Sequence, residues 1–430
     1  MSIRARALAG VAAALMLGAM LGWLAGSLVR SDNLPFFVAL GALAGLLAGL
    51  TWARIARPPV LGTLALLALL LIVILLTPPG VRVEVLAPAP DAAPAFPLDG
   101  LTRAQVATLA SLQKVSDYPL YTMHYAGNSD ISKTRKDSEV PQVPAAGGSW
   151  ACSLFAALGD PAGRLYGRNF DWRFSPALLL FTDRPGTGGY ASVSMVDIAY
   201  LGFDDASVDL TMLPLAERRA LLEAPSWPFD GLNEAGVAVG MAAVPQADAR
   251  HDREKPTLDS LEIMREILDH AGSTGEAVAI LSSYNIDWEG GPYLHYLVAD
   301  RSGHAALVEY HAGQIEVLPN DHAWHAATNF TRSAVAGDAA GQCPRYDALT
   351  HQLSATGGRL DSGAALDLLN SVSQTETLTQ WSVVYDMSVR RVHVVMGRQF
   401  GRVHAFQLNT TRQLLLQRPE TIDTTIAQAR

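Results

Sequence analysis

The sequence is most distinctive in two short segments, Cys152-Ser153-Leu154-Phe155 and Gly167-Arg168-Asn169-Phe170-Asp171-Trp172. Together they place a thiol, a guanidinium group and a carboxyl group at fixed separations, in a chain that has only two cysteines. A thiol is a poor nucleophile until a nearby positive charge or a base lowers its pKa. Arg168 is suited to supply that charge, so the pattern indicates a reactive cysteine.

A structural explanation of the same residues is also open. Free cysteine is among the most buried residue types and often only fills space in a core. On that interpretation Arg168 and Asp171 would form an ion pair inside an otherwise apolar region.

Apolar residues are concentrated near the N-terminus. Residues 7–28, 34–53 and 58–77 contain no Asp, Glu, Lys or Arg, and each segment is close to the ~20 apolar residues with which a helix crosses a bilayer. A cleaved signal peptide at 1–30 is the alternative, but it leaves the two later segments unexplained. We therefore expect three transmembrane helices within residues 1–80.

Arginines indicate the orientation of these helices. Two pairs flank the segments on what would be one side of the membrane, Arg4 with Arg6 and Arg54 with Arg57. Because basic residues favour the cytoplasmic side, we expect a cytoplasmic N-terminus. The chain from about Arg82 onward would then be extracytoplasmic, either periplasmic or extracellular. Residues 81–98 are rich in Pro and Ala and predict an extended linker.

The composition excludes some classes of protein. A net charge of −9 with only 17% charged residues argues against nucleic-acid binding, which needs clustered Lys and Arg. Two cysteines allow at most one disulfide, too few for a disulfide-framed scaffold. The chain contains no internal repeat, Walker loop or dinucleotide-binding fingerprint.

The apolar pattern beyond the linker predicts a mixed fold. Short apolar or alternating runs predict strands at 118–125, 178–182, 191–198, 237–244, 293–300, 305–309, 382–385 and 391–396. Helical spacing predicts helices at 101–115, at 258–268 after an N-cap at Thr257, and at 362–371. This order is typical of the α+β class.

The spacing of the first motif resembles one enzyme family. Arg168 and Asp171 follow Cys152 by 16 and 19 residues, which is similar to the linear amide C–N hydrolases of the Ntn-hydrolase superfamily. That group includes choloylglycine hydrolase, penicillin V acylase and acid ceramidase. The likeness extends over residues 118–400. It implies an αββα sandwich over residues 152–430, preceded by a pro-segment, residues 99–151, that pairs with it.

The resemblance implies roles for the first motif. Cys152 would be the nucleophile, and its own α-amine, freed by autoproteolysis after Ala151, would be the general base. Such an amine has a pKa near ~7.7–8.0 and can accept the thiol's proton, whereas an amide nitrogen cannot. Arg168 would lie beside the thiol, and Asp171 would bind the new amino group.

Two later motifs complete the implied site. Asn329, in Thr328-Asn329, would help to form the oxyanion site, and Arg345 would be a second arginine of the site. Asn233 begins an Asn-Glu-Ala-Gly turn whose role is expected to be structural. One position departs from the bile salt hydrolases, because Ala243 stands where they have a second oxyanion asparagine. Loss of one such donor can cost ~100–1,000-fold in rate unless a backbone N–H replaces it.

These roles predict hydrolysis of a linear, non-peptide amide of a small N-acylated substrate. A lipid-like acyl group would suit a domain tethered at a membrane. Neither a metal nor another cofactor is required; His322 and His325 lie near Asn329 in sequence, but a third ligand at suitable spacing is missing.

Three other functions remain open. An acyltransferase would use the same acyl-enzyme but pass the acyl group to an amine. A papain-like protease would need a histidine beside Cys152, with His304, His311 or His325 as candidates. A non-catalytic, membrane-anchored binding module would explain why Ala243 lacks a donor.

Overall fold

The computed structural model describes residues 100–127, 151–186, 188–248, 250–288, 291–374, 379–408 and 420–423. The expected transmembrane segments and the linker, within residues 1–98, lie outside these described residues. Among the residues that are described, no helix is both long enough and apolar enough to cross a membrane.

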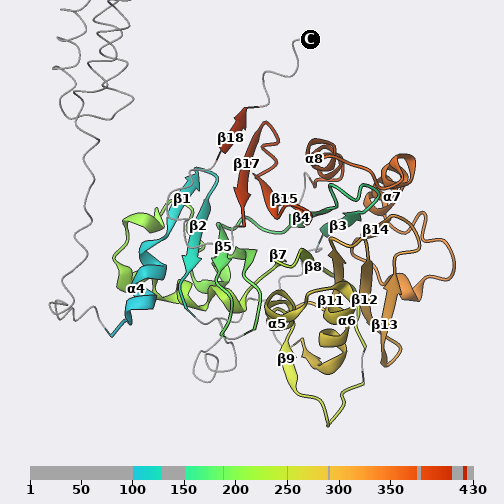
Figure 1. Cartoon of the computed structure of the whole chain (residues 1–430), viewed down its shortest axis with the longest axis horizontal. Helices are drawn as coiled ribbons and strands as arrows, with labels where there is room; N and C mark the ends of the chain where they lie inside the picture. The colour runs from blue at the N-terminus through green and yellow to red at the C-terminus, as the bar shows by residue number, and fades with distance from the viewer. Residues whose placement is uncertain are drawn as a thin grey trace, which may run out of the picture. The chain divides into compact units, whose positions relative to one another are not determined.

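Two β-sheets face each other in the described chain (Figure 1). The larger contains, in spatial order, β1 (Gln113–Ser116), β2 (Leu120–Tyr125), β5 (Ala177–Thr182), β6 (Ser192–Asp197), β7 (Asp230–Asn233), β8 (Val237–Ala243), β11 (Leu294–Asp300), β12 (Ala305–His311) and β13 (Gln314–Pro319). The smaller contains β14 (Trp324–Ala327), β3 (Ala151–Ala157), β4 (Leu165–Asp171), β15 (Thr379–Asp386), β16 (Arg391–Met396), β17 (Arg402–Gln407) and β18 (Glu420–Asp423). Within both sheets the strands pair antiparallel, except that β2 and β5 are parallel.

Helices cover the outer face of each sheet. The larger sheet is covered by α5 (Glu262–His270) and α6 (Thr274–Ser283), and the smaller by α7 (Pro344–Thr356) and α8 (Ser362–Ser371). The α+β class and the αββα layering expected from the sequence are therefore confirmed.

The other elements lie outside these four layers. Beside the β1–β2 hairpin are the helix α4 (Arg103–Ala110) and the 3-10 segments η2 (Ile198–Leu201), η3 (Leu210–Met212) and η4 (Leu215–Ser226). A further 3-10 turn, η5 (Arg332–Ala334), follows β14, and a small parallel pair is formed by β9 (Thr257–Asp259) and β10 (Asn285–Asp287).

Local sequence explains several helix ends. The Ser273 side chain accepts the Glu276 N–H at the start of α6, and Asp361 accepts the Ala364 N–H at the start of α8. Such N-caps satisfy backbone donors that have no partner within the helix. Helix α7 begins with a proline and ends at Gly357, whose φ of 59° is left-handed, a conformation that glycine adopts without strain.

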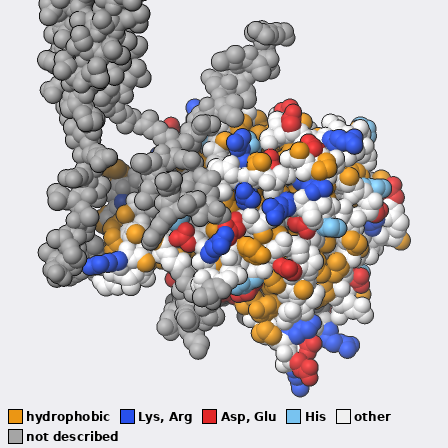
Figure 2. Space-filling view, viewed as in Figure 1, with side chains coloured by type: hydrophobic (Ala, Val, Ile, Leu, Met, Phe, Trp, Pro, Cys, Tyr) orange, Lys and Arg blue, Asp and Glu red, His pale blue; other side chains and the backbone are white. Residues whose placement is uncertain are grey.

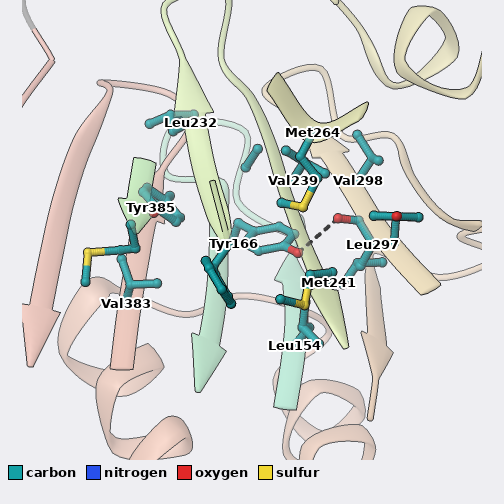
Figure 3. Close-up of a cluster of buried hydrophobic side chains, with 14 of the residues drawn as sticks. Leu154, Tyr166, Leu232, Val239, Met241, Met264, Leu297, Val298, Val383 and Tyr385 are labelled. Atoms are coloured by element: carbon teal, nitrogen blue, oxygen red, sulfur yellow. Dashed lines mark hydrogen bonds between the residues drawn. The ribbon is translucent and has the colours of Figure 1, made fainter. Parts of the chain in front are cut away.

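The main core fills the space between the two sheets. Figure 3 shows Tyr166 among buried side chains of both sheets, with its hydroxyl donating to the Leu297 carbonyl at 2.9 Å. The sheets approach closely at Gly240, where a Cβ atom would lie 2.7 Å from Tyr166 Oη and 3.0 Å from Leu154 Cδ2. A larger residue would therefore have to displace the ends of the facing Tyr166 and Leu154 side chains.

Most of the expected elements are confirmed, and some agree in every residue. Helix 362–371 and strand 391–396 are α8 and β16. The expectation at Thr257 is wrong. That residue begins β9, which pairs with β10, and the helix starts only at Glu262. The helix expected over 101–115 is also too long, because 113–116 pairs with β2 as a strand. In both places strand pairing outweighs local helical spacing.

On the face drawn in Figure 2, acidic and basic side chains are interspersed, with apolar side chains scattered among them.

Candidate active site

Cys152 lies in a buried strand at the centre of the fold. It is the second residue of β3, and its Cα is paired with that of Phe170 in β4, while Ala151 is paired with Asp171. Its side chain belongs to the core between the sheets and is 1% exposed. The register of β3 and β4 therefore explains how residues 16 to 19 positions apart in sequence meet.

Arg168 lies beside the thiol, as the motif predicts. Its Nη2 is 3.9 Å from Cys152 Sγ, and the side chain is completely buried. Burial raises the pKa of the Cys152 thiol, and the charge of Arg168 lowers it without outweighing burial. In this state of the chain the net shift is upward, so the thiol is mostly protonated at neutral pH.

The charge of Arg168 is shared with a carboxylate that the sequence analysis missed. Nη1 of Arg168 bonds the Asp230 carboxylate, which also accepts hydrogen bonds from Trp381 Nε1, at 3.1 Å, and from the Tyr385 hydroxyl. Both charged side chains are fully buried. The only hint in the sequence is one acidic residue within the largely apolar segment 227–232. Its partners lie 62 and more residues away and could not be inferred.

Asp171 has one satisfied and one free oxygen. Its Oδ1 accepts a hydrogen bond from the Thr379 hydroxyl at 2.5 Å, whereas Oδ2 is buried without a hydrogen-bond partner in the described structure. Burial raises the pKa of Asp171 to about 7, although Thr379, Arg345 and Arg168 lower it. The carboxyl group is therefore about half protonated at neutral pH and has room for one more donor.

Asn329 and Arg345 hold the backbone of Cys152. The Cys152 N–H donates to Asn329 Oδ1 at 2.5 Å, and the Cys152 carbonyl accepts from Arg345 Nη1. Nη2 of Arg345 donates to the same Asn329 oxygen at 2.9 Å, and Nη1 also reaches Ser153 Oγ at 3.0 Å. The structure thus brings all five predicted site residues together, although their chemical roles stay a prediction.

Ala243 contributes a carbonyl oxygen to this arrangement. Nδ2 of Asn329 donates to the Ala243 carbonyl at 2.8 Å. The position that carries an oxyanion asparagine in the bile salt hydrolases thus orients Asn329 through its backbone here. Because a side-chain amide has two N–H donors, one N–H of Asn329 remains for another acceptor.

The other polar residues considered in the sequence do not lie beside the Cys152 thiol. Asn233 accepts the Val237 N–H and donates to the carbonyls of Leu268 and Ala271, which fixes its turn as expected. His325 is paired with Ala156 and bonds the Leu318 carbonyl at 3.0 Å, and the His304 side chain is 76% exposed. Neither position is that of a base beside Cys152.

Metal ligands are not grouped in the described part of the chain. Among the residues that the structure describes, no group of three or more His, Cys, Asp or Glu side chains could hold a metal ion. His322 and His325 line a cavity of about 1020 Å³ between β13, β14 and α7, together with Trp324 and Tyr346.

A comparison with protein families identifies the segment that contains this site. Residues 152–332 match the model of the linear amide C–N hydrolases, choloylglycine hydrolase family. This segment belongs to that family. The chain is accordingly a hydrolase that acts on carbon–nitrogen bonds other than peptide bonds in linear amides. The match starts at Cys152 itself and includes Arg168, Asp171 and Asn329, whereas Arg345 lies beyond it.

Solved structures resemble the chain at low sequence identity. A mutant conjugated bile acid hydrolase from Clostridium perfringens is 16% identical, with 63% of this chain and 96% of that chain covered and a TM-score of 0.44. Penicillin V acylase from Agrobacterium tumefaciens is 16% identical, with coverages of 60% and 92% and a TM-score of 0.42. An N-acylethanolamine-hydrolyzing acid amidase ortholog from Caenorhabditis elegans is 16% identical, with coverages of 55% and 93% and a TM-score of 0.37. No curated protein sequence matches the chain.

Proposed function

We propose that this hydrolase cleaves the amide bond of a small N-acylated substrate through an acyl-enzyme on Cys152. The observation that supports this most is the arrangement around one residue. Its thiol lies beside Arg168, its N–H bonds Asn329, and its carbonyl bonds Arg345. The backbone groups of a residue that only filled the core would normally be bonded by a neighbouring strand, whereas here the partners are a side-chain amide and a guanidinium group.

The first step of the proposal is autoproteolysis between Ala151 and Cys152. The thiol attacks the Ala151 carbonyl carbon, the C–N bond breaks, and the chain is joined through a thioester. Water then hydrolyses the thioester, which leaves a carboxylate on Ala151 and a free amine and thiol on Cys152. The nitrogen that donates to Asn329 in the intact chain thereby becomes a base that can accept the thiol's proton.

Asp171 is the proposed partner of the new amino group. Its unsatisfied Oδ2 lies on the residue paired with Ala151, next to the bond that breaks. Once the amine is formed, it supplies N–H donors, and it carries a positive charge while it is protonated. Both effects favour the ionised carboxylate and lower the pKa of Asp171 below the value of about 7 that burial produces in the intact chain.

Turnover then uses the same residues. The α-amine of Cys152 accepts the thiol proton, and the sulfur attacks the substrate carbonyl. The remaining N–H of Asn329, with backbone N–H groups, stabilises the oxyanion. Collapse expels the amine product, which takes the proton from the α-amine, and water hydrolyses the thioester to release the acid and regenerate Cys152.

The location of this chemistry forms part of the proposal. Three N-terminal helices would anchor the protein with its N-terminus in the cytoplasm, and the linker 81–98 would place the catalytic domain outside the cytoplasm. An N-acyl substrate with a lipid-like chain suits this position.

A panel of amides tests the proposed function. It contains N-acyl amino acids, penicillin V, bile salts, N-acyl homoserine lactones and ceramide, assayed with the purified full-length protein and with a Cys152→Ala variant. We expect hydrolysis of at least one class by the natural protein and none by the variant. Intact mass and N-terminal sequencing should place a new terminus at Cys152. An uncleaved chain that is fully active, or a Cys152→Ala variant of undiminished activity, would contradict the mechanism.

A further inference from the structure

A buried histidine and a buried glutamate form a pair outside the predicted site. His295 of β11 and Glu309 of β12 are joined by Nδ1 and Oε1 at 2.8 Å, and both side chains are 1% exposed. His295 is paired in register with Ala242, the neighbour of the residue that orients Asn329.

Glu309 binds more than its histidine. Its Oε1 accepts the Arg332 N–H at 2.8 Å and its Oε2 accepts the Ser333 N–H at 2.7 Å. Burial by itself would raise the pKa of Glu309, but the hydrogen bond and charge of His295 and the hydrogen bonds from Ser333 lower it to about 2. The carboxylate therefore stays ionised and keeps its acceptors at any pH near neutral.

These two N–H groups begin the turn that follows the Asn329 loop. The loop leaves β14 at Ala327 and enters η5 at Arg332, so Asn329 lies between two fixed ends. Pairing with β3 fixes the first end, and Glu309 fixes the second. The Arg332 side chain also fixes the residues that follow, because it donates hydrogen bonds to the carbonyls of Val335 and Gly337.

We infer that the buried His295–Glu309 pair positions Asn329 against the backbone of Cys152. This inference rests on the proposed function, in which Asn329 receives the Cys152 nitrogen and part of the oxyanion. His295 orients the Glu309 carboxylate, the carboxylate holds the loop, and the loop holds Asn329 between Cys152, Arg345 and Ala243. His295 and Glu309 are thus positioning residues that act through Asn329.

Stability alone is a weak explanation of this pair. The cost of removing a buried carboxylate and its polar partner from water often offsets their attraction, so the contact between His295 and Glu309 adds little stability by itself. An apolar pair, however, could not accept the N–H groups of Arg332 and Ser333. The pair also leaves His295 Nε2 buried without a hydrogen-bond partner in the described structure, which is unfavourable for a purely structural contact.

The substitution Glu309→Gln tests the inference. The glutamine keeps the shape but turns one acceptor oxygen into a donor that faces an N–H group. Because a shift of ~1 Å in a catalytic group can cost ~100-fold in rate, we expect kcat to fall by about 10- to 100-fold with an unchanged KM. Hydrogen exchange should become faster in residues 328–335. The matched control is Glu316→Gln, at the directly paired position of β13, which should change neither quantity.

A second pair of variants covers the case in which Glu309→Gln does not fold. His295→Gln keeps a donor for Glu309 and should retain more activity and slower exchange in residues 328–335 than His295→Ala. The assay uses whichever amide of the panel the natural protein hydrolyses. A natural protein that hydrolyses none of them contradicts the proposed function. Hydrogen exchange in residues 328–335, by contrast, needs no substrate, so it tests separately whether His295 and Glu309 fix the Asn329 loop. Unchanged exchange in the folded Glu309→Gln and His295→Ala variants, or faster exchange with an unchanged kcat, would overturn the inference.

Discussion

The Cys152 thiol is subject to two opposing effects. Burial raises its pKa and the neighbouring Arg168 lowers it, but one side of that guanidinium is bound to Asp230. The negative charge of Asp230 offsets part of the positive charge that the thiol would otherwise feel. The pKa of the nucleophile therefore depends on Arg168 and Asp171 of the motif and, through Arg168, on Asp230 outside it.

The substitution Asp230→Asn should lower the pKa of the Cys152 thiol. Removal of the negative charge leaves Arg168 uncompensated, which favours the thiolate. Because asparagine keeps only one acceptor oxygen, either Trp381 or Tyr385 loses its acceptor, which should also reduce stability by about 1–3 kcal/mol. The measurement is the pH dependence of Cys152 alkylation by iodoacetamide. A thiol pKa that rises or does not change would contradict this account. Asp300→Asn, at the last residue of β11, serves as the control.

The carboxyl group of Asp171 should make the intact chain less stable as pH rises. Its folded-state pKa of about 7 exceeds the ordinary value near 3.9, so the folded chain binds a proton more tightly than the unfolded chain. The free energy of unfolding should therefore decrease between about pH 4 and pH 7. Urea unfolding of Cys152→Ala, which stays uncleaved, should show this slope.

The same measurement on Cys152→Ala with Asp171→Asn isolates the carboxyl group. Asparagine does not titrate, so part of the slope between pH 4 and pH 7 should disappear. Asp197, whose pKa burial also raises to about 7, accounts for a remaining part. An identical slope in the two proteins would contradict the assignment to Asp171.

At the scale of elements, the close contact between β8 and the facing sheet depends on a glycine, which has no side chain. Gly240 lies opposite Tyr166 and Leu154, and a Cβ atom there would be 2.7 Å from the Tyr166 oxygen. The same strand carries Ala243, whose carbonyl orients Asn329. The spacing of the two sheets and the geometry of the site are thus linked through β8.

The substitution Gly240→Ala should destabilise the protein by about 1–3 kcal/mol, because overpacking a core forces neighbouring side chains to move. Thermal unfolding measures the change. The control is Gly275→Ala in α6, where a Cβ atom would meet only Ser273 Oγ at 3.9 Å and alanine favours a helix. Equal midpoints for Gly240→Ala and the natural protein would contradict this account, because they would show that the Tyr166 and Leu154 side chains can move at no cost.

At the scale of the whole described chain, residues on both sides of Cys152 build one sheet. Strand β2, before the predicted cleavage site, pairs in parallel with β5 after it. Leu109, Tyr121 and Met123 pack in one apolar cluster with Leu178, Leu180 and Val196. Cleavage at Ala151 would leave this pairing and packing in place.

The two pieces of a cleaved chain should therefore remain together. We expect residues 1–151 and 152–430 to co-elute in gel filtration in detergent and to separate only in denaturant. Elution of the two pieces as separate species under native conditions would contradict the role of the β2–β5 pairing.

Much of the site could be predicted from the sequence because its residues occur in short motifs. Cys152, Arg168 and Asp171 are brought together by one antiparallel pair of neighbouring strands, so a fixed spacing in sequence becomes a fixed spacing in space. Strands such as β16 and helices such as α8 follow from local apolar periodicity. The sequence by itself thus determined the nucleophile motif and the α+β class.

Only the tertiary structure decided what surrounds the motif. Asp230 meets Arg168 across the two sheets, the Ala243 carbonyl meets Asn329, and Glu309 meets the turn after it, over separations of 62, 86 and 23 residues. Thr257 lies in a strand rather than at a helix start because it pairs with β10. Local patterns record which face of a strand or helix is apolar, but not which distant partner will satisfy a buried charge or backbone group, because that depends on how the sheets pack.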